Sequence, residues 1–185
     1  MIQDLDDTLK ELLVRKVPID TSSIDIKFDM PTREWATGVS RPTVNAFLYD
    51  LRENHELRSS ERSLTRSGAV GIERRAPVRM DFTYLITAWT ADVADEHQLL
   101  GRLLLALLRY PVLPDEVLKG AMQTQPLHAW IAQPERTPHA WDFWGVLEGR
   151  LKAGISYVVT ASLEPFPDEE FGLVTEKILK LQPLN

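Results

Sequence analysis

Two runs of strand-forming residues place the strongest constraint on how this chain folds. Residues 44–51 are apolar on both faces of the strand pattern, which is typical of a central strand. Residues 78–90 are rich in β-branched and aromatic side chains and predict a second long central strand. We expect the two strands to pair in antiparallel fashion across the segment 52–77 that joins them.

The joining segment 52–77 has no hydrophobic periodicity and carries a local charge of +2. Serine and glycine are interspersed among glutamates and a larger number of arginines. The arginines are Arg52, Arg58, Arg62, Arg66, Arg74 and Arg75. The pattern predicts a long loop or a flexible hairpin, and loops beyond about 15 residues are usually functional or disordered. Two interpretations stay open: a solvated segment of mixed charge, or a surface that binds an acidic partner.

Amphipathic helices and further strands account for most of the remaining chain. Residues 2–15 repeat apolar side chains at the helical period. Residues 90–96 supply the cap and first-turn acids of a second helix that runs to about Arg109. Alternation at 24–28 predicts a half-buried strand, and residues 155–164 predict a clear one. Weaker patterns predict helical turns at 115–122, a short strand at 127–131, a helix start at 137–144 and a strand at 173–181.

Length and composition narrow the class of protein. A chain of 185 residues is long enough for one domain, 1–185, with its own core. It holds no cysteine, which excludes disulfides, zinc knuckles, iron–sulfur clusters and thiol nucleophiles. A net charge of −6 argues against general nucleic-acid binding, which needs a basic face. The longest apolar run, 103–108, is far shorter than the ~20 residues that span a bilayer, and the acidic N-terminus lacks the features of a signal peptide.

The sequence carries no recognisable catalytic, cofactor or metal motif. There is no Gly-x-Ser-x-Gly elbow and no dinucleotide fingerprint. The scattered histidines, none paired at metal-ligand spacing, are His55, His97, His128 and His139. His97 follows Asp92, Asp95 and Glu96, but acids there are explained as the cap and first turn of a helix. Because a Ser–His–Asp triad is recognised by geometry rather than by spacing, a small hydrolase stays an alternative.

Apolar side chains in two places predict contact surfaces. Leu105 falls on the otherwise polar stripe of the second helix, beside Gln98 and Arg102. Trp141 and Trp144 are three residues apart, so on a helix they share one face. Such a stripe is typical of a core or an interface rather than of a platform for a ligand.

An ordered set of motifs resembles a known family. The motifs lie in the two central strands, in the second helix and in the later part of the chain. They are Asn45-Ala46-Phe47-Leu48-Tyr49-Asp50 with Glu53-Asn54, Tyr84-Leu85-Ile86-Thr87-Ala88-Trp89, Glu96-His97-Gln98-Leu99-Leu100-Gly101, the segment Trp141–Trp144, and Ser156-Tyr157-Val158-Val159. Together they resemble the cap, or tail-terminator, family of phage-tail-like contractile injection systems, over essentially the whole chain.

The resemblance implies an α/β (α+β) fold with a mixed, largely antiparallel sheet flanked by helices. It implies a structural protein without catalytic residues or cofactors. Family members form a homohexameric ring at the distal end of the particle, where they terminate the inner tube and the sheath and couple the two. The expected partners are therefore further copies of the chain, the inner tube protein and the sheath protein. The particle would be assembled in the cytoplasm and then either released or docked at a membrane. An unrelated adaptor protein is a second alternative.

Surface residues are accordingly the predicted sites. The arginines expected to bind tube or sheath are Arg58, Arg62, Arg66, Arg74 and Arg75. Leu105, Trp141 and Trp144 are expected at contacts between subunits.

Overall fold

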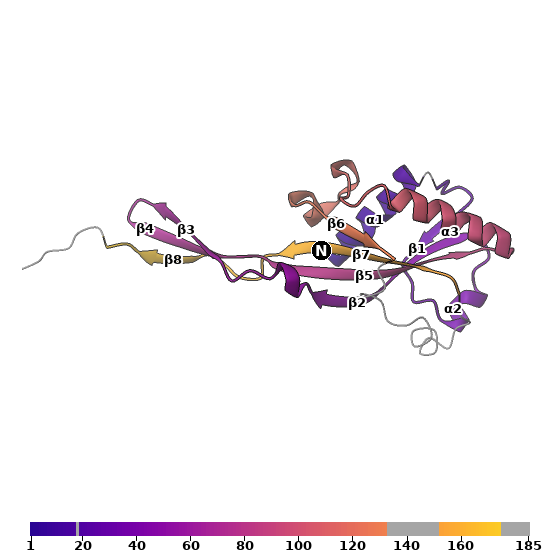
Figure 1. Ribbon diagram of the computed structural model, residues 1–185, viewed down its shortest axis with the longest axis horizontal. Coiled ribbons are helices and arrows are strands. Elements are labelled where there is room, and N and C mark those ends of the chain that lie inside the picture. Colours follow the sequence, from indigo (N-terminus) through magenta and orange to yellow (C-terminus); the bar gives the residue numbers. More distant parts are fainter. Residues whose placement is uncertain (18, 133–151, 175–185) are drawn as a thin grey trace, which may run out of the picture. The chain divides into compact units, whose positions relative to one another are not determined.

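The two predicted central strands form the middle of a five-stranded sheet (Figure 1). The computed structural model describes residues 1–17, 19–132 and 152–174. Strands β2 (Thr43–Glu53) and β5 (Val78–Trp89) pair in antiparallel register, from Thr43 opposite Trp89 to Glu53 opposite Met80. The predicted antiparallel pairing is therefore confirmed. A bulge interrupts the register between Leu48 and Asp50.

By its contacts the chain divides into two units. The first unit takes in Met1–Asn54 and Met80–Ala161, and the second takes in His55–Arg79 with the residues from Ser162 onward. The expectation of one domain over 1–185 stays a prediction. The segment 137–144, including Trp141 and Trp144, and nearly all of 173–181 lie outside the described residues.

The sheet of the first unit has the strand order β1-β2-β5-β7-β6. Strand β1 (Asp25–Lys27) runs parallel to β2, whereas β6 (His128–Ile131) and β7 (Ile155–Leu163) pair antiparallel. The predicted fold class, a mixed and largely antiparallel sheet with helices, is therefore confirmed.

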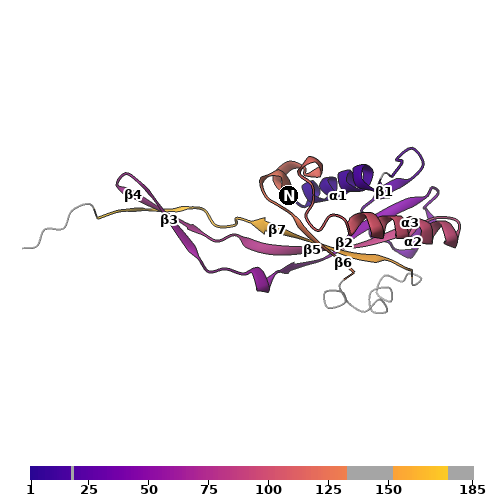
Figure 2. The same ribbon diagram turned by 45° about the horizontal axis from the view of Figure 1, so that its top comes forward.

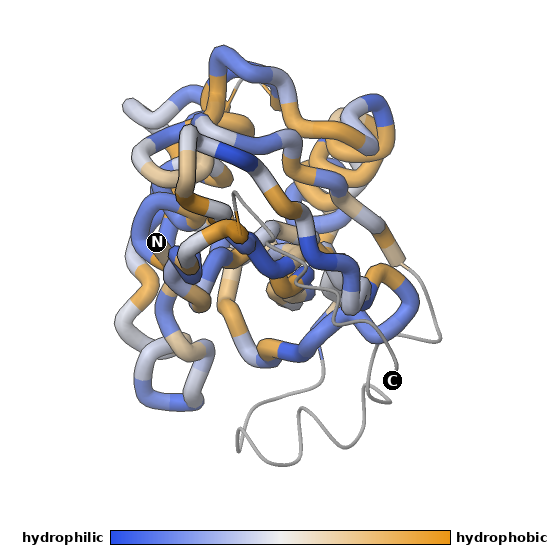
Figure 3. Tube along the Cα trace, turned by 90° about the vertical axis from the view of Figure 1, so that its left-hand side faces the viewer, coloured by the Kyte–Doolittle hydropathy of each residue, from blue (hydrophilic) through white to orange (hydrophobic). Residues whose placement is uncertain are grey.

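Two helices cover one face of this sheet because their apolar stripes join the same core. Helix α1 (Ile2–Lys16) contributes Leu5, Leu9 and Leu12, and helix α3 (Val93–Leu107) contributes Leu99 and Leu103. Alternate residues of β2, β5 and β7 complete this core. Figure 2 shows α1 lying along one side of the sheet, and the trace in Figure 3 shows hydrophobic and hydrophilic residues interleaved along the chain.

Polar contacts fix the helices on the sheet. The buried hydroxyl of Tyr84 donates to the carboxylate of Asp6 at 2.8 Å. Burial raises the pKa of both groups, since each charged form would lose its hydration. Asp92 caps α3 by accepting from the amide of Ala94 at 2.6 Å, as the acids of this stretch predict. The short 3-10 helices η2 (Asp115–Val117) and η3 (Gly120–Thr124) pack against α1.

The other face of the sheet carries polar and aromatic side chains. Asn45 is fully buried; its amide donates to the backbone carbonyl of Asp29 and accepts from the amide of that residue. Trp35 of helix α2 (Arg33–Thr37) packs edge-to-face on Trp89, with ring centroids 5.2 Å apart. The indole of Trp35 also donates to Asp29, so this short helix is held by specific bonds rather than by a large apolar face.

The second unit holds a three-stranded antiparallel sheet in the order β3-β4-β8. The strands are β3 (Arg62–Ser67), β4 (Val70–Arg75) and β8 (Glu169–Gly172), and the 3-10 helix η1 (His55–Leu57) precedes them. The segment 52–77, predicted as a long loop or a hairpin, thus contains a regular hairpin at its centre. Strand β8 has no counterpart in the sequence-based expectations; Leu173 and Val174 follow it outside any strand.

Candidate assembly interface

The hairpin β3–β4 is closed by a turn that requires glycine. Gly68 and Ala69 connect Ser67 to its cross-strand partner Val70, and Gly68 has φ +64°. A positive φ at the first central position is typical of a type II′ turn, whose twist matches that of the strands. The hairpin is therefore built to be regular even though every residue of β3 is exposed.

Three of the five predicted partner-binding arginines are paired inside the small sheet. Arg62 binds Glu73 at 2.5 Å, and Arg75 binds Glu169 at 2.8 Å. Arg74 donates two hydrogen bonds to the carboxylate of Asp168, at 2.9 and 2.8 Å. The guanidinium holds the pKa of Asp168 below its usual range, and the carboxylate raises the pKa of Arg74.

These pairs change the charge that the unit presents. Its described residues contain six arginines against seven carboxylates, a net charge of −1. The positive charge of 52–77 is thus offset by the acids of 164–170. The sequence-based predictions did not include those acids. The run of three acids from Asp168 to Glu170 is the sequence feature by which they could have been found.

Arg66 differs from these three arginines because its contact in this sheet is with a backbone carbonyl and not with a carboxylate. Its Nε donates to the carbonyl of Gly68 in the adjacent turn, at 3.0 Å. Among the described residues it makes no ion pair within 4 Å. Arg58 follows η1 and is exposed. The sequence-based role of all five arginines in binding a partner stays a prediction.

The strand register sorts the side chains of this sheet onto two faces, because directly paired residues share a face. We call the face that carries Arg62, Leu64 and Arg66 on β3 the charged face. It continues through Gly71, Glu73 and Arg75 on β4, and Glu169 and Phe171 on β8. Gly71 is buried beneath Phe171, and a Cβ at this position would lie 2.8 Å from two ring carbons. A glycine is needed there for this close approach.

The first unit exposes apolar side chains at the C-terminal end of α3. Leu105 is 63% exposed and Leu108 is 55% exposed, so the outward position predicted for Leu105 is confirmed. Its role in a subunit contact stays a prediction.

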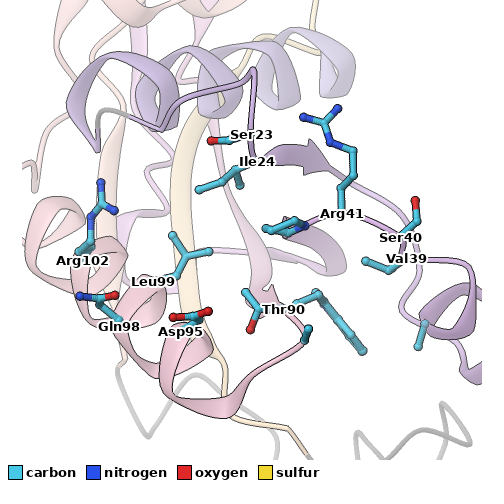
Figure 4. Close-up of a pocket in the computed structure, with 14 residues that line it drawn as sticks. Ser23, Ile24, Val39, Ser40, Arg41, Thr90, Asp95, Gln98, Leu99 and Arg102 are labelled. Atoms are coloured by element: carbon cyan, nitrogen blue, oxygen red, sulfur yellow. The ribbon is translucent and has the colours of Figure 1, made fainter.

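The first unit also contains an open cavity of about 460 Å³ between α3 and the segment that leads into β2 (Figure 4). Asp95, Gln98 and Arg102 lie on the α3 side, and Ser40 and Arg41 lie on the other. None of the described residues that line the cavity is a histidine.

The described histidines lie on three separate elements. His55, His97 and His128 belong to η1, α3 and β6, and His139 lies outside the described residues. Within residues 1–17, 19–132 and 152–174 no three His, Asp or Glu side chains are grouped in a way that could hold a metal ion. Over the same ranges, no helix has the length and apolar character needed to cross a bilayer.

Fold and surface together define a class of protein: a mixed α/β domain that also carries a small, charged sheet with exposed outer strands. The family can be stated more narrowly. The chain belongs to the Pvc16 N-terminal domain family, whose profile matches residues 4–176. The resemblance inferred from the sequence motifs is therefore confirmed.

Two solved structures share the fold. One is the sheath/tube terminator of an extracellular contractile injection system, PVC, in the extended state; it is 22% identical, with a TM-score of 0.73, and the match covers 100% of this chain and 64% of the other. The second is the tube-terminating cap of the anti-feeding prophage, 21% identical with a TM-score of 0.68, covering 99% of this chain and 62% of the other. The chain thus spans somewhat less than two thirds of the length of either. No curated protein sequence matches it.

Proposed function

We propose that this chain caps the distal end of a contractile injection particle, where it terminates the inner tube and the sheath. The observation that carries the proposal is the family match over nearly the whole chain, supported by the shared fold with two terminator structures. The proposal includes a homohexameric ring that couples tube to sheath. Its partners are then further copies of the chain, the inner tube protein and the sheath protein.

The physical reasoning concerns how a polymer is stopped. A head-to-tail contact repeated with a closing rotation gives a ring, and a six-fold ring matches a six-fold tube. A ring that offers no docking surface on its far side ends the polymer. Such a role needs complementary surfaces, and the exposed outer strands of the small sheet are surfaces of this kind. In this proposal the particle is assembled in the cytoplasm before it is released or docked at a membrane.

Deletion of the gene tests the proposal. Negative-stain electron microscopy of particles from the deletion strain should show tubes or sheaths of uncontrolled length, or no complete particles. Expression of the wild-type chain from a plasmid should restore a uniform length. Particles of normal length and stability from the deletion strain would refute capping. Gold labelling of the chain on wild-type particles should mark the end opposite the baseplate.

A further inference from the structure

The small sheet of the second unit ends in two strands that have open outer edges. Its order is β3-β4-β8, and among the described residues neither β3 nor β8 pairs with a strand on its outer side. All residues of both strands are exposed. An open edge presents unpaired backbone N–H and C=O groups and is therefore a template on which another strand can pair.

The two edges carry opposite charge. Strand β3 holds Arg62 and Arg66 and no acid. The run from Asp168 into β8 holds Asp168, Glu169 and Glu170 and no base. The charge within this sheet is thus separated between a basic edge and an acidic edge.

We propose that the outer edge of β3 in one copy of the chain pairs with the outer edge of β8 in the next copy, so that the small sheets of neighbouring copies join into one. The inference rests on the proposed function in that a ring supplies the neighbouring copies. Because β3 and β8 both run antiparallel to β4, they run in the same direction. Copies related by rotation about an axis along the strands therefore meet in a parallel pair.

The side chains on the charged face fit this pairing. In a parallel pair with Leu64 of one copy beside Phe171 of the next, Arg62 of the first copy lies beside Glu169 of the second. The guanidinium of Arg62 and the carboxylate of Glu169, which each have one partner in their own sheet, thus gain a second. Leu64 is 63% exposed and Phe171 is 41% exposed, and each side chain covers the other.

The same charges disfavour the alternative in which two identical edges meet about a twofold axis. Two β3 edges would place arginine beside arginine, and two acidic edges would place carboxylate beside carboxylate. Like charges directly opposite each other destabilise a strand pair. The charge separation therefore favours a head-to-tail contact, which is the type that closes into a ring.

Disulfide trapping tests the pairing directly, because the chain has no cysteine of its own. The test variant carries Leu64→Cys and Phe171→Cys together. Within one copy these positions lie on strands two apart and are offset by two residues along the strands, so they are separated by more than about 9–10 Å, which is beyond the reach of a disulfide. Mild oxidation of the purified chain and of isolated particles should yield a ladder of covalent multimers. The matched control, Leu64→Cys with the equally exposed Val93→Cys on α3, should yield none.

Charge reversal gives an independent measurement on the soluble chain. Arg62→Glu should weaken self-association about tenfold in sedimentation velocity, since an attractive cross-strand pair becomes a repulsive one. The double variant Arg62→Glu/Glu169→Arg should recover most of the loss. Arg33→Glu, the same change at an exposed site on α2, should leave association unchanged.

The possible outcomes distinguish this inference from the proposed function. No ladder in either preparation, or dimers formed equally well by Leu64→Cys alone, would overturn edge pairing. The capping role would survive such a failure if wild-type particles carry the chain at one end. Wild-type particles that lack the chain by mass spectrometry would instead count against the capping role itself.

Discussion

The ion pair between Glu96 and Lys152 allows a quantitative test of how the first unit is held together. Glu96 lies in the first turn of α3, and Lys152 lies three residues before β7. Only 10% of the Glu96 side chain and 17% of the Lys152 side chain are exposed. The Nζ of Lys152 also lies 4.7 Å from the centroid of the Trp89 ring. The pair therefore joins α3, β5 and the residues that lead into β7.

Replacing Lys152→Met removes the cation and keeps most of the side-chain volume. It leaves the Glu96 carboxylate buried without a partner, and breaking a buried pair in this way costs about 3–5 kcal/mol. The remaining exposure and the N-terminal position of Glu96 on its helix place the expected loss near 3 kcal/mol. At about 2–4 °C per kcal/mol for a chain of this size, the Tm should fall by about 6–12 °C.

Urea unfolding followed by tryptophan fluorescence measures this loss. The double variant Glu96→Gln/Lys152→Met removes both charges and should recover at least half of the lost stability, because no unpaired charge remains. The control Lys10→Met lies on the exposed face of α1 and should change stability by less than about 0.5 kcal/mol. A single variant as stable as the wild type, or a double variant that shows the simple sum of two losses, would refute a buried pair.

Three further predictions follow from single contacts. Gly71→Ala should loosen the small sheet by about 1–3 kcal/mol because its Cβ would meet the Phe171 ring, and Phe171→Ala should rescue it; unchanged hydrogen exchange in β4 would contradict the clash. Because Arg74 lowers the pKa of Asp168, this pair stabilises the sheet above pH about 4 and is lost as the pH falls through the lowered pKa; Asp168→Asn should abolish that acid dependence of exchange, and an unaltered profile would exclude the pair as its cause. Leu103→Ala should cost about 2–5 kcal/mol in urea unfolding, since Leu103 is fully buried between α3 and the sheet, and a loss below 1 kcal/mol would contradict that packing.

Periodicity predicted the first unit well because burial dominates there. Tyr84, Ile86 and Ala88 alternate into a core and leave a period-2 pattern that can be recognised without knowing the partners. The same holds for α3, whose Asp92 cap and leucine stripe are local features. The 3-10 helix η2 follows Pro114, and neither η2 nor η3 has such a period, which is why only their approximate position could be predicted.

The small sheet could not be predicted in the same way because it buries almost nothing. Strand β8 reads Glu-Glu-Phe-Gly, and no hydrophobic alternation marks it. Its contacts are with β4 and include ion pairs of Asp168 and Glu169 with Arg74 and Arg75, residues that lie more than 90 positions earlier in the chain. Sequence patterns report local periodicity, whereas a charge-paired sheet depends on which distant segments meet. The arginines were therefore recognised as a feature, but their partners were not.

That pairing alters what an arginine-rich hairpin means. Arginines that are already paired with carboxylates inside the sheet add little attraction for an acidic partner. A new exposed ion pair with such a partner would contribute about 1 kcal/mol at most. The charge is nevertheless distributed unevenly across the sheet, with two arginines on the edge strand β3 and two glutamates on the edge strand β8. A surface with one sign of charge would attract any acidic partner, whereas a sheet with two opposite edges discriminates between orientations of its own copies. If the chain is a cap, selecting one orientation matters more than tight binding, since a ring closes only when every contact is made in the same sense.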